Sequence, residues 1–312
     1  MYLIVIILTT LFTPSCHERV NHKGEFDYEE VKDSFFYDLN EPDDRFELPA
    51  DLEEISGLTW LDDGMLGAIQ DEVGHMFYIS ATTGEVVNEI KFGTEGDYEG
   101  VENVEDILFA IKSNGKLYRF PVSDEDVEGE LFDNPLNIKN NVEGLGYWPE
   151  RNMLLIGCKE DQKIDEDDLE DYEDEQGIEE DDDDEKEYKD DYLIYGFDVS
   201  ENRFITNPIL AIDEDDIEDF FEDRYKGEFE GDKFAISGVA FHSLEKRLYL
   251  ISSAARMLMI VDMEGNVTGM HPLDRDVLRQ PEGLCVAPDG TLYIASEGRG
   301  GDGYFVRYRY RK

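Results

Sequence analysis

Carboxylate and hydroxyl side chains recur at one position of a short phrase that the chain repeats five times, directly before a glycine and an aliphatic residue. The five glycines lie 43, 44, 94 and 45 residues apart. A fixed period of this size indicates a repeat architecture, in which equivalent residues of successive units come together. The oxygen-bearing residues at this position are Ser56, Glu99, Glu143, Ser237 and Glu282.

Three glutamates that meet on one axis must either hold protons or bind a cation, because like charges raise each other's pKa. Oxygen ligands without histidine or cysteine select calcium over zinc or copper. Calcium takes about 6–8 oxygens, which carboxylates, hydroxyls, carbonyls and water can supply. We therefore expect calcium as a cofactor. Further candidate ligands on the same rim are Glu54, Glu72, Glu160 and Glu297, with Asp71 and Asp97 beside them.

A simpler interpretation of the same residues needs no ion. Polar side chains at these positions could face a water-filled channel, with Lys159 supplying the opposite charge. The residue types alone leave both interpretations open.

The repeat itself predicts the fold. Each unit holds short apolar runs separated by turns, such as the Asp289-Gly290 turn before residues 291–295. An Asp-Gly pair between apolar runs is a strong hairpin signal. Four short strands in a unit of about 44 residues are typical of a propeller blade. Two acidic insertions, 160–191 and 213–230, account for the long interval. We expect an all-β, five-bladed β-propeller of four-stranded blades.

The last repeat supplies only three strands before the chain ends, so its fourth strand must come from elsewhere. Two N-terminal segments, 34–39 and 45–48, have no other predicted place. Pairing one of them there closes the ring and removes open sheet edges, which invite aggregation. The sequence thus predicts closure by an N-terminal strand.

Composition and charge limit the partners. The 312 residues carry a formal net charge of −49. This charge repels nucleic acid and anionic membrane surfaces. We expect the insertion 160–191 to be a solvated, largely disordered loop, since it has little apolar content to bury. The spacing of apolar residues in 213–230 instead suggests a short amphipathic helix. Cys158 and Cys285 lie in apolar strand contexts, which favours buried free thiols.

The chain begins with an apolar run that ends at Cys16. Its length suits a signal peptide and is too short to cross a bilayer. Residues 13–16 are similar to a bacterial lipoprotein cleavage box, which would make Cys16 the lipid-modified residue, although Thr13 departs from that box. A plain signal peptide or an uncleaved anchor is the alternative. We expect a signal over 1–16, a linker over 17–33 and the propeller over 34–312, exported to the cell envelope as an outer-membrane lipoprotein.

These motifs also resemble a known family. The phrases around Gly57, Gly100, Gly144 and Gly283, taken in order with the segments 70–72, 158–160 and 296–297, are similar to the SdiA-regulated family over roughly residues 45 to 305. That resemblance implies a five-bladed bacterial propeller, distantly similar to NHL-repeat proteins, with calcium at a shared site. It does not assign a biochemical role. Asn114 stands where the family often has an acidic residue.

Two functions follow from these observations. The first is a cell-envelope calcium-binding propeller that binds or scaffolds a protein or small molecule on its face, with the lipid as its sole membrane attachment. The alternative is a calcium-dependent hydrolase of the lactonase or esterase kind, by analogy with other propellers. His75 is the one histidine that we expect near the channel mouth. No catalytic residue can be assigned, so the sequence leaves enzymatic activity undecided.

Overall fold

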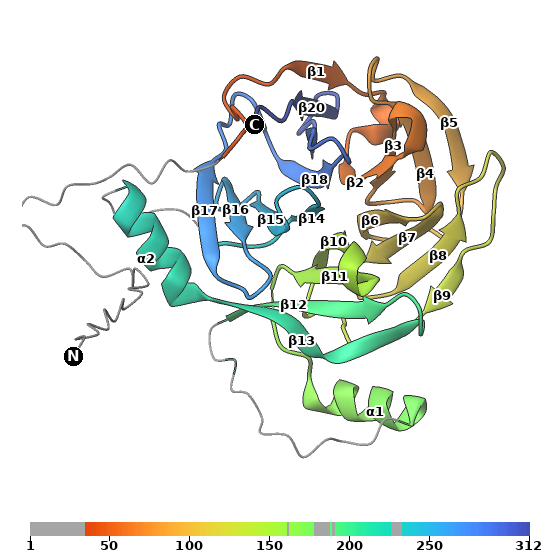
Figure 1. Cartoon of the computed structure of the whole chain (residues 1–312). Coiled ribbons are helices and arrows are strands. Elements are labelled where there is room, and N and C mark those ends of the chain that lie inside the picture. Colours follow the sequence, from red (N-terminus) through yellow and green to blue (C-terminus); the bar gives the residue numbers. More distant parts are fainter. Residues whose placement is uncertain (1–34, 161, 178–187, 189–190, 226–232) are drawn as a thin grey trace, which may run out of the picture. The chain divides into compact units, whose positions relative to one another are not determined.

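The computed structural model describes residues 35–160, 162–177, 188, 191–225 and 233–312. Within these residues the chain forms five antiparallel sheets of four strands each, arranged around a common centre (Figure 1). The prediction of a five-bladed β-propeller is therefore confirmed. In all but the last blade, the strands follow in chain order from the centre outward.

The strand bounds show how regular the repeat is. Blade 1 holds β2 (Ile55–Leu61), β3 (Met65–Gln70), β4 (His75–Ser80) and β5 (Val86–Lys91). Blade 2 holds β6 (Tyr98–Val104), β7 (Ile107–Lys112), β8 (Leu117–Pro121) and β9 (Glu130–Phe132). Blade 3 holds β10 (Val142–Trp148), β11 (Met153–Cys158), β12 (Asp191–Asp198) and β13 (Arg203–Asp213). Blade 4 holds β14 (Gly238–His242), β15 (Arg247–Ser252), β16 (Met257–Val261) and β17 (Val267–Pro272).

Blade 5 closes the ring. It combines β18 (Pro281–Val286), β19 (Leu292–Ser296) and β20 (Tyr304–Tyr308) with β1 (Asp44–Glu47) from the start of the fold. Strand β1 pairs antiparallel with β20 from Asp44 opposite Arg307 to Glu47 opposite Tyr304. Closure by an N-terminal strand is thus confirmed, and the second of the two candidate segments provides it.

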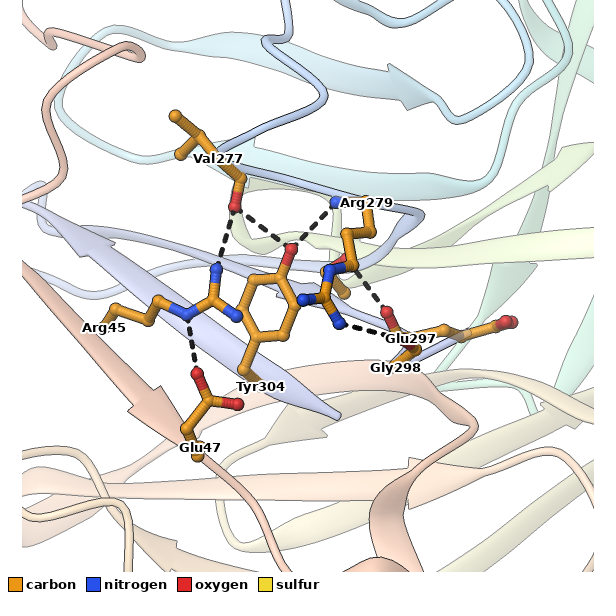
Figure 2. Close-up of polar contacts among 8 residues, drawn as sticks. Arg45, Glu47, Val277, Arg279, Glu297, Gly298 and Tyr304 are labelled. Atoms are coloured by element: carbon orange, nitrogen blue, oxygen red, sulfur yellow. Dashed lines mark hydrogen bonds and ion pairs between the residues drawn. The ribbon is translucent and has the colours of Figure 1, made fainter. Parts of the chain in front are cut away.

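Side chains reinforce this closure. Arg45 of β1 lies 3.4 Å above the ring of Tyr304 and donates to the Val277 carbonyl, and the Tyr304 hydroxyl donates to the same carbonyl at 3.0 Å (Figure 2). The other candidate segment has a different role, because Tyr37 and Leu39 are buried among side chains of blades 4 and 5. The Tyr37 hydroxyl lies 2.7 Å from Nε2 of the buried His242.

The recurring glycine allows the inner strands to approach each other. A Cβ atom added at Gly100 would lie 2.8 Å from Cβ of Leu145 in the next blade, closer than real Cβ contacts. The equivalent glycines meet the inner strand of the following blade in the same way, all the way round the ring. The pairs are Gly57 with Val101, Gly144 with Val239, Gly238 with Glu282 and Gly283 with Leu58.

The register of the inner strands determines where the residue before each glycine lies. The ladder shifts between Ile55 and Gly57, Tyr98 and Gly100, and Val142 and Gly144. A shift also separates Pro281 from Leu284. A bulge of this kind adds a residue that has no ladder partner and re-aims its side chain. The irregularity therefore falls on the position that carries the candidate ligands.

The two acidic insertions contain helices. Helix α1 (Glu166–Gln176) corrects the expectation of a largely disordered loop over 160–191. Its Tyr172 is buried in the core of blade 3, and the Tyr172 hydroxyl accepts from the Phe204 amide at 3.3 Å. The prediction of a disordered loop did not account for Tyr172, whose aromatic ring attaches this largely acidic helix to the core. Residues 161, 178–187 and 189–190 of that expectation lie outside the described part of the chain.

Helix α2 (Glu214–Tyr225) forms within the second insertion, as its apolar spacing predicts. Ile217 is buried between blades 3 and 4, and Phe220 and Phe221 pack beside it. Three one-turn helices complete the elements: η1 (Ala50–Leu52), η2 (Asp62–Gly64) and η3 (Pro149–Arg151). Cys158 and Cys285 are buried free thiols, as expected. No helix in the described ranges is long and apolar enough to cross a membrane.

Candidate functional site

The inner strands of all five blades line one small pocket on the propeller axis. Its polar lining includes the carboxylates of Glu99, Glu143 and Glu282 and the residue Ser56. The aliphatic residues after each glycine line the same pocket; they are Leu58, Val101, Leu145, Val239 and Leu284. The structure therefore brings together the three glutamates that the repeat predicts.

Burial and mutual repulsion raise the pKa of Glu99 and of Glu282. Burial, followed by the charges of Glu143 and Asp97, raises the pKa of Glu99 to about 10. Burial, followed by Glu143, raises the pKa of Glu282 to about 8. At neutral pH both carboxyls hold protons unless a cation is present.

Glu143 differs from the other two because a lysine contacts it. Burial raises the pKa of Glu143, and the Lys159 ammonium acts against that rise. Nζ of Lys159 lies 2.6 Å from Oε1 of Glu143, whose side chain is 7% exposed. Burial lowers the pKa of Lys159, but Glu143, Glu282 and Glu99 outweigh it and raise that pKa. The ammonium is therefore a shared counter-charge for glutamates of three blades.

A second group of carboxylates lies beside the first. Burial raises the pKa of Asp71 to about 6, with further contributions from Glu54 and Asp97. Burial raises the pKa of Glu297 to about 7, with Asp71 and Glu54 contributing next. Atom Oδ1 of Asp71 is buried and has no hydrogen-bond partner among the described residues. An orphaned carboxylate oxygen facing like charges is a place where a cation would be stabilising.

The other candidate ligands make different contacts, and most of them lie outside the axial pocket. The Ser56 hydroxyl donates to the Tyr98 carbonyl at 2.7 Å, and the Ser237 hydroxyl donates to the Pro281 carbonyl at 2.9 Å, so both tie neighbouring blades together. Ser237 does not line the axial pocket. Glu72 is exposed and lines a separate cavity of about 390 Å³.

Glu160 also does not line the axial pocket. It is exposed and lines a cavity of about 740 Å³ together with Gln162, Lys163 and Tyr192. Glu54 lines the cavity that contains Glu72, and its charge also contributes to the raised pKa of Asp71. Among the rim residues, Asp71 is partly buried and raises the pKa of Glu297, whereas its neighbour Glu72 is exposed. The sequence could not distinguish these two residues.

The described carboxylates are not arranged as a finished metal site. No group of three or more Asp, Glu, His or Cys side chains within the described ranges is placed to hold a metal ion. The position of Glu143 contributes to this, because its carboxylate is directed to Lys159. The donor set nevertheless consists of oxygen atoms, which suits calcium in kind.

Two further titratable residues, His75 and Glu102, do not line the axial pocket. Nδ1 of His75 lies 2.6 Å from Oε1 of Glu89, and both line the cavity that contains Glu72. Glu102 has a pKa raised by burial to about 7 and accepts a 2.7 Å hydrogen bond from Thr59 of blade 1. The sequence analysis missed Glu102, whose signal is a second glutamate in the inner strand that already carries Glu99.

Comparison with known proteins supports the fold and the resemblance. The SdiA-regulated family model matches residues 222–299, which include the phrases around Gly238 and Gly283. The resemblance predicted from the sequence is therefore confirmed over this segment. No curated protein matches the chain.

Solved structures of other proteins are similar to this chain in overall fold. The crystal structure of Myxococcus xanthus glutaminyl cyclase is 10% identical, with 86% of this chain and 95% of that chain covered and a TM-score of 0.53. The PQQ-bound aldose sugar dehydrogenase from Streptomyces coelicolor is also 10% identical, with coverages of 86% and 97% and a TM-score of 0.49. At this level of identity, the likeness to the cyclase concerns the fold alone.

Proposed function

We propose that this chain, a β-propeller with the SdiA-regulated match over residues 222–299, is a calcium-binding protein of the cell envelope that binds or scaffolds a ligand on its face. One observation carries the proposal. Three glutamates from three different blades, Glu99, Glu143 and Glu282, line a single axial pocket and oppose one another's ionisation.

The chemistry of the donors supports calcium. The residues that would hold the ion are Glu99 and Glu282, with Asp71 and Asp97 on the adjoining rim and Glu143 once it separates from Lys159. A bound calcium ion would supply positive charge, which removes the repulsion between blades and links their loops. The buried Asp71 oxygen without a partner is a further donor that an ion would satisfy.

The partner would contact the same end of the propeller. The two cavities of about 390 and 740 Å³ are both lined by rim residues next to inner or second strands, with Glu54 just before β2 and Glu160 shortly after β11. Propeller loops at this end can therefore present a ligand surface around the axis. The ligand would be a protein or a small molecule, and nucleic acid is disfavoured by the charge of −49.

Thermal unfolding with calcium and with EDTA tests the ion site. Calcium at a hundred times its Kd stabilises the folded state by about 2.7 kcal/mol, so the melting temperature should rise by several degrees. Changing Glu99 and Glu143 to Gln together should abolish the rise. Glu72→Gln is the matched control, because Glu72 is exposed and lies in another cavity. A calcium response that persists unchanged in the double variant would refute the assignment.

This test must be made in a protein that lacks the most acidic part of the insertion. Residues 178–187 contain eight acidic residues and could bind calcium weakly on their own. Replacing these ten residues with a Gly/Ser linker in every variant removes that contribution. Helix α1 is retained, because Tyr172 belongs to the core of blade 3.

Export and lipidation form the second part of the proposal. The supporting observation is the apolar start of the chain up to Cys16, which lies outside the described residues. Mass spectrometry of the native protein should find acyl chains on an N-terminal Cys16. Recovery of a chain that retains Met1 from the cytoplasmic fraction would contradict this part and leave the ion site untouched.

A calcium-dependent hydrolase is the alternative that the same site would serve. His75, the histidine expected near the mouth, pairs with Glu89 and lines the cavity of Glu72 instead of the axial pocket. Hydrolysis of aryl esters, lactones or phosphotriesters by purified protein, dependent on calcium and lost in Glu99→Gln, would favour this alternative over a binding protein.

A further inference from the structure

Lys159 is the cation that the described structure places in contact with the axial carboxylates. It follows directly after β11, and its amide donates to the Asn141 carbonyl at 2.9 Å. Its Nζ reaches Oε1 of Glu143 at 2.6 Å, and Nδ2 of Asn141 donates to the same oxygen at 3.2 Å. Backbone and side-chain contacts therefore hold the ammonium against a carboxylate that is itself buried.

The neighbouring basic residues are engaged elsewhere. Nζ of Lys112 donates to the Glu95 carbonyl at 2.9 Å and lies 4.5 Å from the centre of the Tyr98 ring. The guanidinium of Arg279 donates to the Gly298 carbonyl at 3.1 Å, and that of Arg299 donates to Gln280 (Figure 2 shows the first of these). Within the described ranges, Lys159 alone forms an ion pair with an axial glutamate.

The ammonium and a metal ion would need the same carboxylate. Oε1 of Glu143 already accepts two hydrogen bonds, and the side chain of Lys159 is 32% exposed, so the lysine has a path to solvent. A charge-assisted hydrogen bond of this length is strong in a partly buried setting. A cation entering the pocket must break it and must also overcome repulsion from the ammonium.

We propose that Lys159 is a displaceable internal counter-ion that competes with calcium for Glu143 and thereby sets the calcium affinity of the channel mouth. The inference rests on the proposed function and adds its regulation. The empty protein is neutralised by its own lysine, and calcium binding is an exchange in which the ammonium moves to solvent. The propeller thus folds without metal, and the exchange raises the calcium concentration that half-fills the site.

Isothermal titration of calcium into the full chain with the 178–187 linker tests the exchange. Lys159→Met removes the charge and keeps most of the side-chain volume, so calcium should bind at least about tenfold tighter than to the parent protein. Lys116→Met, which removes an exposed lysine that has no contact with the axial glutamates, is the control for net charge and should leave the affinity unchanged.

A measurement without metal gives a second, independent result. In EDTA, Lys159→Met leaves the buried Glu143 carboxylate without its partner, so the variant should melt several degrees below the parent protein, and calcium should reverse the loss. In the Glu143→Gln background the same substitution should change the melting temperature little. An equal effect of Lys159→Met in both backgrounds would overturn the inference.

The outcomes distinguish the inference from the proposed function. If the parent protein binds calcium in a manner that Glu99→Gln/Glu282→Gln abolishes, but Lys159→Met binds no tighter, Lys159 does not compete and only the inference fails. If neither protein binds calcium at this site, both fail. Should Lys159→Met not fold, Lys159→Gln applies the same test, because it also removes the ammonium that pairs with Glu143. A calcium affinity equal to that of the parent protein would overturn the inference.

Discussion

Gly238 lies directly against the carbonyl oxygen of Glu282, so close that a Cβ atom added at Gly238 would be 2.4 Å from that oxygen. The contact joins the inner strands of blades 4 and 5 beside a candidate calcium ligand. The glycine recurs because neighbouring inner strands pack too closely for a Cβ atom. In every blade the same glycine contacts the inner strand of the next blade.

The first prediction concerns this contact. Gly238→Ala should destabilise the protein by about 1–3 kcal/mol, because the backbone on both sides must shift to admit a methyl group. Gly301→Ala is the control, since its added Cβ would meet the flexible end of the Arg279 side chain at 3.1 Å. Chemical denaturation should give a large change in the free energy of unfolding for the first variant and a small one for the second. Equal stability of the two would show that the inner strands tolerate wider spacing.

The second prediction concerns ring closure. A chain that begins at residue 35 keeps β1 and Tyr37, whereas a chain that begins at residue 48 lacks both and leaves β20 unpaired along one edge. An open edge invites pairing between molecules. Size-exclusion chromatography and thermal melts should find the longer chain soluble and stable, and the shorter one aggregated or much less stable. A soluble, equally stable shorter chain would contradict closure by β1.

The third prediction is a pH dependence of stability in EDTA. The folded-state pKa of Glu282 is raised to about 8, first by burial and then by Glu143, whereas the unfolded chain titrates near the ordinary value of 4.5. The folded protein therefore binds more protons between these values, so stability is full below about pH 4.5 and declines as the pH rises toward 8. One such proton contributes a slope of about 1.4 kcal/mol per pH unit.

Urea denaturation at pH 5, 6, 7 and 8 measures this slope. Glu282→Gln should flatten it, and Glu72→Gln, which changes an exposed side chain, should not. Stability that rises with pH over this interval in the parent protein would show that Glu282 is ionised in the folded state.

The fourth prediction separates the two parts of the acidic insertion. Replacing residues 178–187 with a Gly/Ser linker of equal length should leave the melting temperature nearly unchanged, since the length of the closed loop stays the same. Tyr172→Ala should lower it by many degrees, because an aromatic side chain leaves the core of blade 3 and the Phe204 amide loses its acceptor. Differential scanning calorimetry compares them, and a linker variant that unfolds as early as Tyr172→Ala would contradict the division.

The sequence was sufficient for the fold because each blade repeats the same physical pattern. The period of Gly57, Gly100 and Gly144 predicts the inner strands, and the missing fourth strand of the last repeat predicts the closure. Helix α1 was not predicted, because the apolar contribution of Tyr172 is hidden among acidic residues.

The candidate site was predicted in part. The position before each glycine placed Glu99, Glu143 and Glu282 in one pocket correctly. Periodicity could not decide between adjacent residues such as Asp71 and Glu72, because the side of the chain that each faces depends on loop conformation. It also could not show that Ser56 donates its hydroxyl hydrogen to the next blade, since that contact depends on the distance between strands.

The pairing of β1 with β20 also affects when the chain can finish folding during its synthesis. Asp44 and its partner Arg307 are 263 residues apart, so one strand of this ladder leaves the ribosome long before the other. Contacts this distant in sequence form slowly, because the intervening chain must first be brought together. Until β20 has been made, β1 has no partner, and the unfinished ring keeps the nascent chain from completing its fold.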